Sequence, residues 1–151
     1  MLTIKDSIWT WLVPDGEREI NRKQWPRHGG KWIVFARKDR IVQLAKELRP
    51  FIDSGEIVSA KYWNGDPSAI NVYSLDRDRD TTGRVLEKLG AGHSRVWEYD
   101  YAWDKNICSP LTFTYSWFSK FRTIFQSYGV RGAFLLLRKT MGSDTDPDAD
   151  E

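Results

Sequence analysis

The chain has 151 residues, of which 40% are hydrophobic and 29% charged, a composition typical of one globular domain with a buried core and not of a disordered chain. The net charge of +2 is unevenly distributed, because the last eleven residues carry five carboxylates and no basic side chain. The remainder is basic, which favours an anionic partner such as a nucleotide, a nucleic acid or a phosphopeptide; a solubilising balance of surface charges explains it equally well. The single cysteine, Cys108, excludes an internal disulfide and a cysteine-based zinc cluster.

The N-terminal segment has no long apolar core behind a basic end, so no signal peptide is predicted. The longest apolar run, Ala133 to Leu137, is far shorter than a membrane-spanning helix. These observations predict a cytoplasmic protein that does not associate with a membrane. We expect a single α+β domain over residues 1–140 and a disordered acidic tail over residues 141–151.

The first third of the chain predicts two strands separated by a polar loop. Ile8 to Val13 is typical of a first strand or an anchoring arm, and Pro14-Asp15-Gly16 ends it as a turn. Glu17 to His28 is polar and basic and predicts a loop, which Trp25-Pro26 would attach to the body of the domain. Two glycines then lead into a buried strand, Lys31 to Ala36.

The middle of the chain predicts a helix followed by a hairpin. Asp39 is expected to cap a helix that runs to about Ser54, with its last turn kinked or reinitiated at Pro50. A strand from Glu56 to Trp63 follows. The next strand, Ala69 to Leu75, comes after a strong turn signal, so these two strands are expected to pair antiparallel.

The alternating charges of Asp76 to Asp80 predict a solvated loop. Thr81 or Thr82 would then cap a second helix that ends at Gly90. Four further elements are expected: a strand at Arg95 to Tyr101, a short strand at Leu111 to Tyr115, a helix from Trp117 to Tyr128 that Gly129 ends, and a final strand at Val130 to Lys139.

This order of elements predicts an α+β fold in which a curved, largely antiparallel sheet carries about three helices on one face. The opposite face would be left for a ligand or a partner. In the strand Glu56 to Trp63, alternation places Ile57, Ser59, Lys61 and Trp63 on one face and Val58, Ala60 and Tyr62 on the other.

A basic residue precedes a tryptophan by two positions in two predicted strands, as Lys61-x-Trp63 and Arg95-x-Trp97. If both pairs face one groove, the indoles can stack on a base while the cations hold phosphate. The alternative is that both tryptophans are core residues and that the cations extend past them to solvent. The candidate ligand-binding residues are Trp63, Arg95, Trp97, Glu98, Trp103 and Arg37.

Acid–base chemistry is a second hypothesis, with Lys61 as the base and His28 as the acid. Exposed loop histidines are the alternative for both His28 and His93. The spacing of these histidines matches no metal-ligand pattern, so no metal is expected. No Walker-type glycine-rich loop or dinucleotide fingerprint is present, and no cofactor is predicted.

Several short segments of the chain share their order and spacing with a known family: Gly30 to Phe35, Gly55 to Ile57 with Ala60-Lys61, Asn71 to Ser74 with Asp76, and Leu89-Gly90. They resemble the basophilic-leukaemia-expressed protein (Bles) family, which includes proteins labelled as phosphothreonine lyase domains. The resemblance covers about half of the chain. It implies a fold like that of the mRNA cap-binding translation initiation factor, a curved antiparallel sheet backed by three helices.

In cap-binding relatives two tryptophans sandwich a base, an acid reads its edge and basic residues hold the phosphates. The residues here with suitable chemistry are Trp63, Trp97 or Trp103, Glu98, and Lys61 with Arg95. The leading hypothesis is therefore a non-enzymatic domain that binds a nucleotide or RNA on a basic, aromatic face. The alternatives are a phosphothreonine lyase-like enzyme with Lys61 as base, and a protein-interaction module that uses exposed tryptophans.

Overall fold

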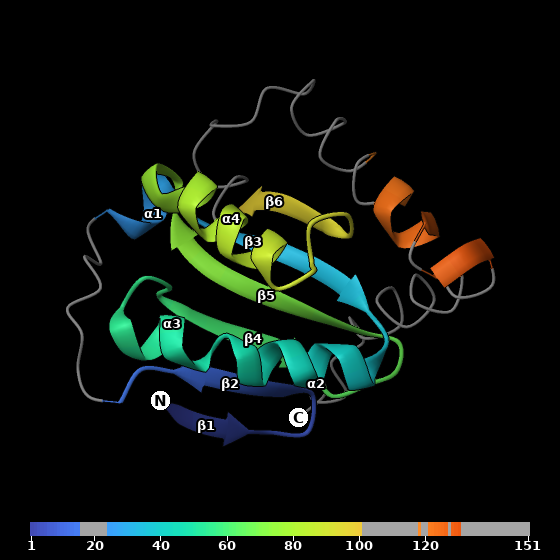
Figure 1. The fold of residues 1–151 in the computed structure, drawn as a ribbon, viewed down its shortest axis with the longest axis horizontal. Coiled ribbons are helices and arrows are strands. Elements are labelled where there is room, and N and C mark those ends of the chain that lie inside the picture. Colours follow the sequence, from blue (N-terminus) through green and yellow to red (C-terminus); the bar gives the residue numbers. More distant parts are fainter. Residues whose placement is uncertain (16–23, 101–117, 119–120, 127, 131–151) are drawn as a thin grey trace, which may run out of the picture.

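The computed structural model describes residues 1–15, 24–100, 118, 121–126 and 128–130. Its centre is a six-stranded antiparallel sheet with the strand order β1-β2-β4-β5-β3-β6 (Figure 1). The strands are β1 (Leu2–Lys5), β2 (Trp9–Val13), β3 (Gly29–Ala36), β4 (Ser59–Trp63), β5 (Ser68–Leu75) and β6 (Arg95–Tyr99). The helices are α1 (Trp25–His28), α2 (Lys38–Glu47), α3 (Arg49–Ser54) and α4 (Arg79–Lys88), with a 3-10 turn, η1, at Asp76–Asp78.

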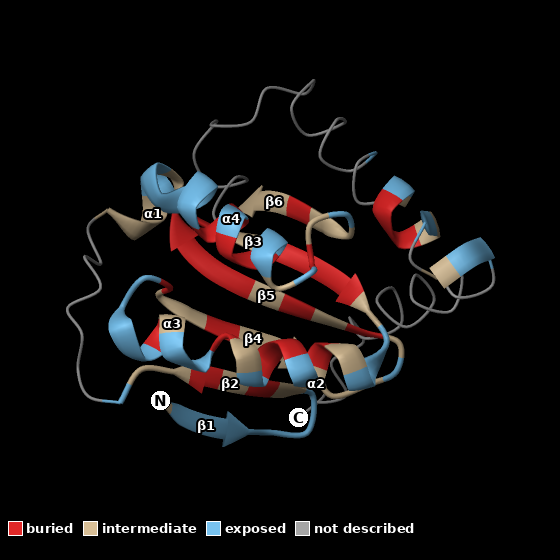
Figure 2. Cartoon of the chain, in the orientation of Figure 1, coloured by how far each residue is buried: buried red, intermediate tan, exposed pale blue. Residues whose placement is uncertain are grey.

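The predicted α+β fold with an open, curved antiparallel sheet is confirmed. Helices α2, α3 and α4 lie across one face of the sheet, called the helical face below (Figure 1). The largest hydrophobic cluster lies between them: α2 contributes Ile41 and Leu44, and the strands contribute Ala60, Ile70 and Val72. These side chains are almost fully buried, and Figure 2 shows the buried bands along the central strands and the sheet-facing side of α2.

The helix predicted from Asp39 to Ser54 is two helices, as Pro50 indicated. Helix α2 ends at Glu47 and α3 begins at Arg49, because proline lacks the amide proton that would continue the α2 hydrogen bonding. Gly55 ends α3 with φ of 87°, a conformation that favours glycine. The predicted cap was wrong, since Arg37 is the N-cap residue and Asp39 lies inside the first turn.

The hairpin of β4 and β5 is confirmed, but its first strand begins later than predicted. Ser59 pairs with Tyr73, and Ile57 precedes the strand. Ile57 was expected to share a face with Lys61; instead it is fully buried in the core of the helical face. Its amide donates a 3.0 Å hydrogen bond to the carbonyl of Phe51, so this residue follows the geometry of the turn after α3 and not the alternation of the strand.

The structure differs from the sequence analysis in three other places. Strand β1, which is exposed along its whole length, was not predicted. The predicted loop at Asp76 to Asp80 forms η1 and the start of α4, which therefore begins at Arg79 and not at a threonine cap. The end of the loop predicted at Glu17 to His28 is helix α1.

Helical residues 121–126 and 128–130 pack on the other face of the sheet. There Ile124 joins a second hydrophobic cluster with Ile33 and Phe35 of β3. The hydroxyl of Tyr128 lies within hydrogen-bonding distance of the carbonyls of Ala36, at 2.9 Å, and of Ser68. The helices are thus not confined to one face, because this segment covers the end of the opposite face near Phe35.

The part of the chain described by the structure contains no helix that is long and apolar enough to cross a membrane. Gly129, predicted to end the last helix, has φ of 64°, and Val130 after it is still helical. Several features of the sequence analysis lie outside the described residues: Trp103, Cys108, the short strand at Leu111 to Tyr115, residues 131–139 of the final strand, and the acidic tail at 141–151.

The hydroxyl of Thr82 supplies a test of the packing beneath α4. Thr82 is fully buried, and within the described residues this hydroxyl has no hydrogen-bond partner. A buried unpaired hydroxyl costs about 1–3 kcal/mol, so Thr82→Val is expected to raise the free energy of unfolding by about 1 kcal/mol. Urea denaturation measures the change. Thr81→Val, on the exposed side of the same turn, should leave the free energy of unfolding unaltered. A loss of stability in Thr82→Val would contradict the packing described here.

Candidate functional site: a lysine among aromatic rings

The ammonium group of Lys61 lies over aromatic rings contributed by two neighbouring strands. Its Nζ is 4.6 Å from the ring centroid of Trp9, 4.5 Å from that of Trp11 and 5.9 Å from that of Tyr73. These distances are those of cation–π contacts. The four residues Trp9, Trp11, Lys61 and Tyr73 are called the lysine–aromatic cluster below.

Strand pairing explains this gathering. Lys61 in β4 stands directly opposite Trp11 in β2 and opposite Asn71 in β5. Directly opposed residues of antiparallel strands point to the same face, and residues two positions away along a strand share that face. Trp9 and Tyr73 therefore complete the group as diagonal neighbours of Lys61.

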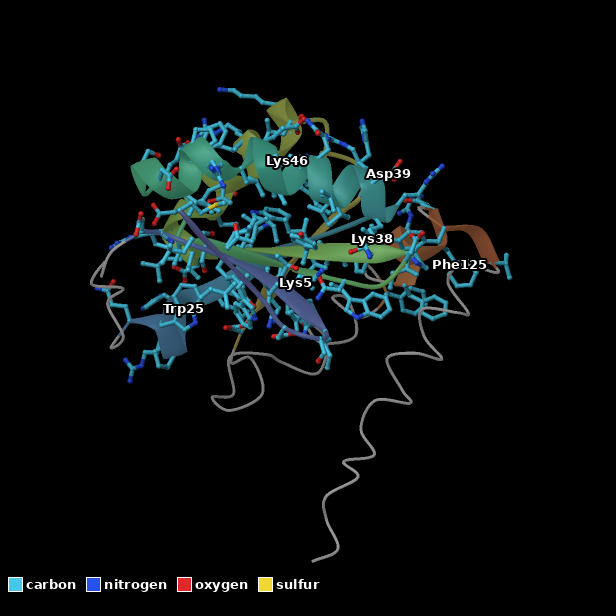
Figure 3. The ribbon with its side chains drawn as sticks, turned by 90° about the horizontal axis from the view of Figure 1, so that it is seen from below. Lys5, Trp25, Lys38, Asp39, Lys46 and Phe125 are labelled. Atoms are coloured by element: carbon cyan, nitrogen blue, oxygen red, sulfur yellow. The ribbon has the colours of Figure 1, made fainter. Side chains whose placement is uncertain are left out.

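The lysine–aromatic cluster lies on the face of the sheet opposite α2, α3 and α4. The neighbours of Lys61 in the chain, Ala60 and Tyr62, belong to the core of the helical face, so the alternation of β4 directs Lys61 the other way. Figure 3 shows the two sides: Lys46 of α2 lies above the sheet and Trp25 of α1 below it. Lys61 and Trp63 therefore lie on the face opposite α2, α3 and α4.

The electrostatic state of Lys61 differs from that of an ordinary surface lysine. Burial, and then the nearby positive charge of Lys31, hold its pKa below the usual value, while Asp100 and Asp6 act in the opposite direction. Among the described residues no carboxylate lies within salt-bridge distance of Lys61. Lys31, by contrast, forms a 2.8 Å ion pair with Asp100. Lys61 is thus the lysine of this face whose charge lacks a close counter-ion in the described structure.

Two carboxylates frame the lysine–aromatic cluster without pairing with its cation. Asp100 accepts a 3.2 Å hydrogen bond from the indole of Trp25 and also forms the ion pair with Lys31. The ring of Trp25 lies 6.1 Å from that of Tyr73, so this residue attaches its segment to the domain as the sequence predicted. The burial of Tyr73, together with Asp100, raises the pKa of its hydroxyl, which stays protonated at neutral pH.

Asp6, the second carboxylate, positions Trp9 and Trp11 of the lysine–aromatic cluster. Its carboxylate accepts hydrogen bonds from the backbone amides of Ile8, at 2.7 Å, and Trp9, at 2.6 Å. These bonds hold the pKa of Asp6 below its usual value. Its second oxygen lies 3.4 Å from the indole nitrogen of Trp11. The turn between β1 and β2 thereby determines where the rings beside Lys61 lie.

The second basic-x-Trp pair does not join the first. The hypothesis that both pairs face one groove is wrong, because Trp97 stands opposite Trp32 in the register and both lie on the helical face beside α4. Their rings meet edge to face at 5.5 Å. Arg95 donates a hydrogen bond to the carbonyl of Gly83 in α4 and lies 3.6 Å from the carboxylate of Glu87. Arg95 and Trp97 thus connect α4 to the edge of the sheet.

The other predicted ligand-binding residues are dispersed. Trp63 shares the face of Lys61 but packs against the second hydrophobic cluster, as Phe125 and Tyr128 of the C-terminal helical residues also do. Glu98 lies on the same face, opposite Lys31. Arg37 is an exposed residue at the start of α2, and Trp103 lies outside the described residues.

His28, the predicted acid, is not beside Lys61. It forms a 3.0 Å contact with Asp76, with half of its side chain exposed. Lys61 stands opposite Asn71 of β5, and Gly29, which follows His28, stands opposite Leu75 of the same strand. Asn71 and Leu75 are roughly 13 Å apart along the strand. A direct acid–base pair between Lys61 and His28 is therefore not formed. Among the described residues, no group of three metal-ligating side chains is close enough to hold a metal ion.

The sequence analysis missed Trp9, Trp11 and Tyr73 as site residues. A signal was present, because Trp9-x-Trp11 places two indoles on one face of a predicted strand. Nothing local indicated that this strand pairs with the one carrying Lys61, more than forty residues away in the chain. Comparison with known proteins adds no assignment: no family model matches the chain, and no curated protein matches it.

Proposed function

We propose that the protein binds a phosphorylated ligand with an aromatic ring, of the nucleoside monophosphate class, at the lysine–aromatic cluster. The observation that carries the proposal is the partly buried ammonium of Lys61, which lies over two indole rings and has no close carboxylate among the described residues. The family resemblance implied a nucleotide or RNA ligand, and this geometry is compatible with the first of these.

The phosphate is the part of the ligand that Lys61 would bind. Burial has already removed some of the water around this cation, so a phosphate oxygen would restore hydrogen bonds that the folded protein has lost. Charge-assisted hydrogen bonds of this kind contribute about 1.5–3 kcal/mol each. The side-chain amide of Asn71, directly opposite Lys61, is hydrogen-bonded to Tyr73, and its second N–H is a neutral donor on the same face.

The aromatic rings support a flat ligand. Trp9 and Trp11 are partly exposed, and a planar base can pack on the ring surface that Lys61 leaves uncovered. Stacking of a base on an aromatic side chain contributes about 1–3 kcal/mol and tolerates any base. The same cluster therefore offers contacts for both parts of a nucleotide.

The charges of this face favour one phosphate over a chain of them. In the described strands, Lys31 and Lys61 are the basic side chains on this face, and Asp100 already neutralises Lys31. Glu98 adds a further negative charge beside Lys31. RNA binding depends on several phosphate contacts, which this arrangement does not supply.

Titration of the full chain with adenosine and guanosine monophosphates tests the proposal. We expect saturable quenching of tryptophan fluorescence by the monophosphates and at least about tenfold weaker binding of the matching nucleosides, which lack the charge that Lys61 would bind. An oligonucleotide should bind no more tightly than the monophosphate. Absence of quenching, confirmed by absence of heat in calorimetry, would refute the proposal.

A second candidate function is favoured by the lowered pKa of Lys61, which suits a general base. In a phosphothreonine lyase-like reaction, Lys61 would take the proton from Cα, the Cβ–O bond would break and phosphate would leave, generating a dehydrobutyrine residue. Release of phosphate from a phosphothreonine peptide measures this activity. Its absence in the intact protein would eliminate the second candidate and leave nucleotide binding untouched.

The third hypothesis, a protein-interaction module that uses exposed tryptophans, has less support. The large hydrophobic side chains that are exposed in the N-terminal region are aliphatic, not aromatic: Leu2, Ile4 and Ile8.

A further inference from the structure

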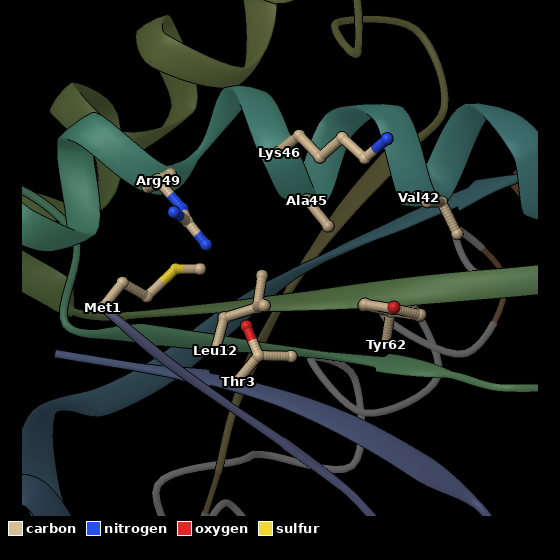
Figure 4. Close-up of a pocket in the computed structure, with 8 residues that line it drawn as sticks. All are labelled: Met1, Thr3, Leu12, Val42, Ala45, Lys46, Arg49 and Tyr62. Atoms are coloured by element: carbon tan, nitrogen blue, oxygen red, sulfur yellow. The ribbon is translucent and has the colours of Figure 1, made fainter. Parts of the chain in front are cut away.

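A pocket of about 510 Å³ lies on the helical face, between α2 and the first strands (Figure 4). Thr3 and Leu12 form a directly opposed pair of β1 and β2 within its lining. The pocket is separated from Lys61 by the sheet itself, because Ala60 and Tyr62 point to this side and Lys61 to the other. Its volume is in the range of sites that hold small molecules.

The inner wall of the pocket is apolar. Leu12 and Ala45 are almost fully buried and belong to the main core, and the partly buried Val42 and Tyr62 extend this surface outward. An occupant in contact with these side chains would gain about 25 cal/mol for each Å² of apolar surface that it removes from water. The wall thus suits an alkyl chain better than a hydrogen-bonding ring.

The rim of the pocket is cationic. In Figure 4 the guanidinium of Arg49 points into the pocket, and the hydroxyl of Thr3 lies on the same side, while Lys46 extends along the outside of α2. In the described structure neither Arg49 nor Lys46 has a carboxylate within salt-bridge distance. Arg40 of the same region differs, because it is paired with Glu47 at 3.1 Å.

We infer that this pocket binds an amphipathic anion of the medium-chain carboxylate class. The carboxylate would accept hydrogen bonds from Arg49, whose fork of donors fits two oxygens, and the alkyl chain would lie on Leu12, Ala45 and Val42. A nucleotide fits this site less well, because the base would leave its polar edge unpaired against the apolar wall. The inference does not depend on the lysine–aromatic cluster.

Octanoate, with octylammonium as its charge-reversed match, tests this inference. Isotope-labelled full-length protein is titrated with each compound, and amide chemical shifts are followed by NMR. We expect saturable shifts at Val42 and Ala45 with octanoate, and at least about tenfold weaker binding of octylammonium. Equal binding of the two compounds, or octanoate shifts that map away from α2 and β1, would overturn the assignment.

Two variants sharpen the test. Arg49→Gln is expected to weaken octanoate binding about tenfold or more, while Arg84→Gln, which removes the same charge from an exposed position of α4, should not change it. Thr3→Trp should prevent binding by filling the pocket from the exposed strand β1 without altering a buried residue. Unchanged affinity in Arg49→Gln would refute the role of its guanidinium. Lys61→Met should leave octanoate binding intact, so failure here is distinguishable from failure of the nucleotide proposal.

Discussion

Replacing Lys61 with methionine is expected to weaken binding of a nucleoside monophosphate roughly ten- to hundredfold, since one or two charge-assisted hydrogen bonds to the phosphate are lost. Methionine retains an unbranched side chain that can still cover Trp9 and Trp11, so the change removes the charge with little change in packing. Calorimetric titration of both proteins at the same ionic strength measures the difference. The nucleoside without phosphate should bind the two proteins equally.

Lys88→Met is the matched control, because it removes one positive charge from the exposed end of α4. Lys88→Met should reduce the affinity for the nucleoside monophosphate only slightly, because the charge that it removes is distant from the site and screened by salt. Lys61→Met should also have an undiminished free energy of unfolding at neutral pH. The pKa of Lys61 is lower in the folded state than in the unfolded chain, so its positive charge does not stabilise the fold. Equal nucleotide affinity in Lys61→Met and the wild type would remove Lys61 from the site.

Gly30→Ala is expected to lower the free energy of unfolding by about 3 kcal/mol through overpacking. A Cβ at this position would lie 2.4 Å from Cζ2 of Trp97 and 2.8 Å from the carbonyl oxygen of Glu98. The indole can shift only by disturbing its contact with Trp32, and the carbonyl belongs to the strand that pairs with β3. Relief of the clash therefore requires β3 and β6 to move apart.

Gly83→Ala provides the comparison for this measurement. Its Cβ would meet the ring of Trp32 at 3.2 Å, a contact that a small movement relieves, and alanine favours helix α4 by about 1 kcal/mol over glycine. The net change in the free energy of unfolding should therefore be within about 1 kcal/mol of zero. Urea denaturation of the two variants separates the cases, and equal losses would contradict the close packing of β3 against β6.

The nucleotide and carboxylate proposals concern opposite faces of one sheet. Lys61 and Arg49 are the cations of the two sites, and neither has a close carboxylate in the described residues. Their environments differ, because Lys61 is surrounded by aromatic rings and Arg49 borders an aliphatic wall. This difference is the physical basis for assigning a ring-bearing phosphate to one face and an alkyl carboxylate to the other.

Much of the local structure follows from the sequence because its causes lie within a few residues. The run before Ala36 forms a strand, since branched and aromatic side chains favour an extended backbone. Pro50 divides α2 from α3, and Gly55 ends α3 with a positive φ. The turn after Trp63 returns the chain as β5. Errors occur at element ends, where Ile57 follows a turn instead of the strand pattern.

What the sequence by itself determined is that Lys61 and Trp63 share one face of a strand and that Arg95 and Trp97 share one face of another, because side chains alternate along any extended chain. It also indicated an α+β domain. Only the tertiary structure decided that the two pairs lie on opposite faces, since this depends on the register of β6 against β3 and on where α4 packs. The same pairing of distant strands brought Trp9 and Trp11 to Lys61. Strand neighbours and register are set by contacts between residues far apart in the chain, which local patterns do not encode.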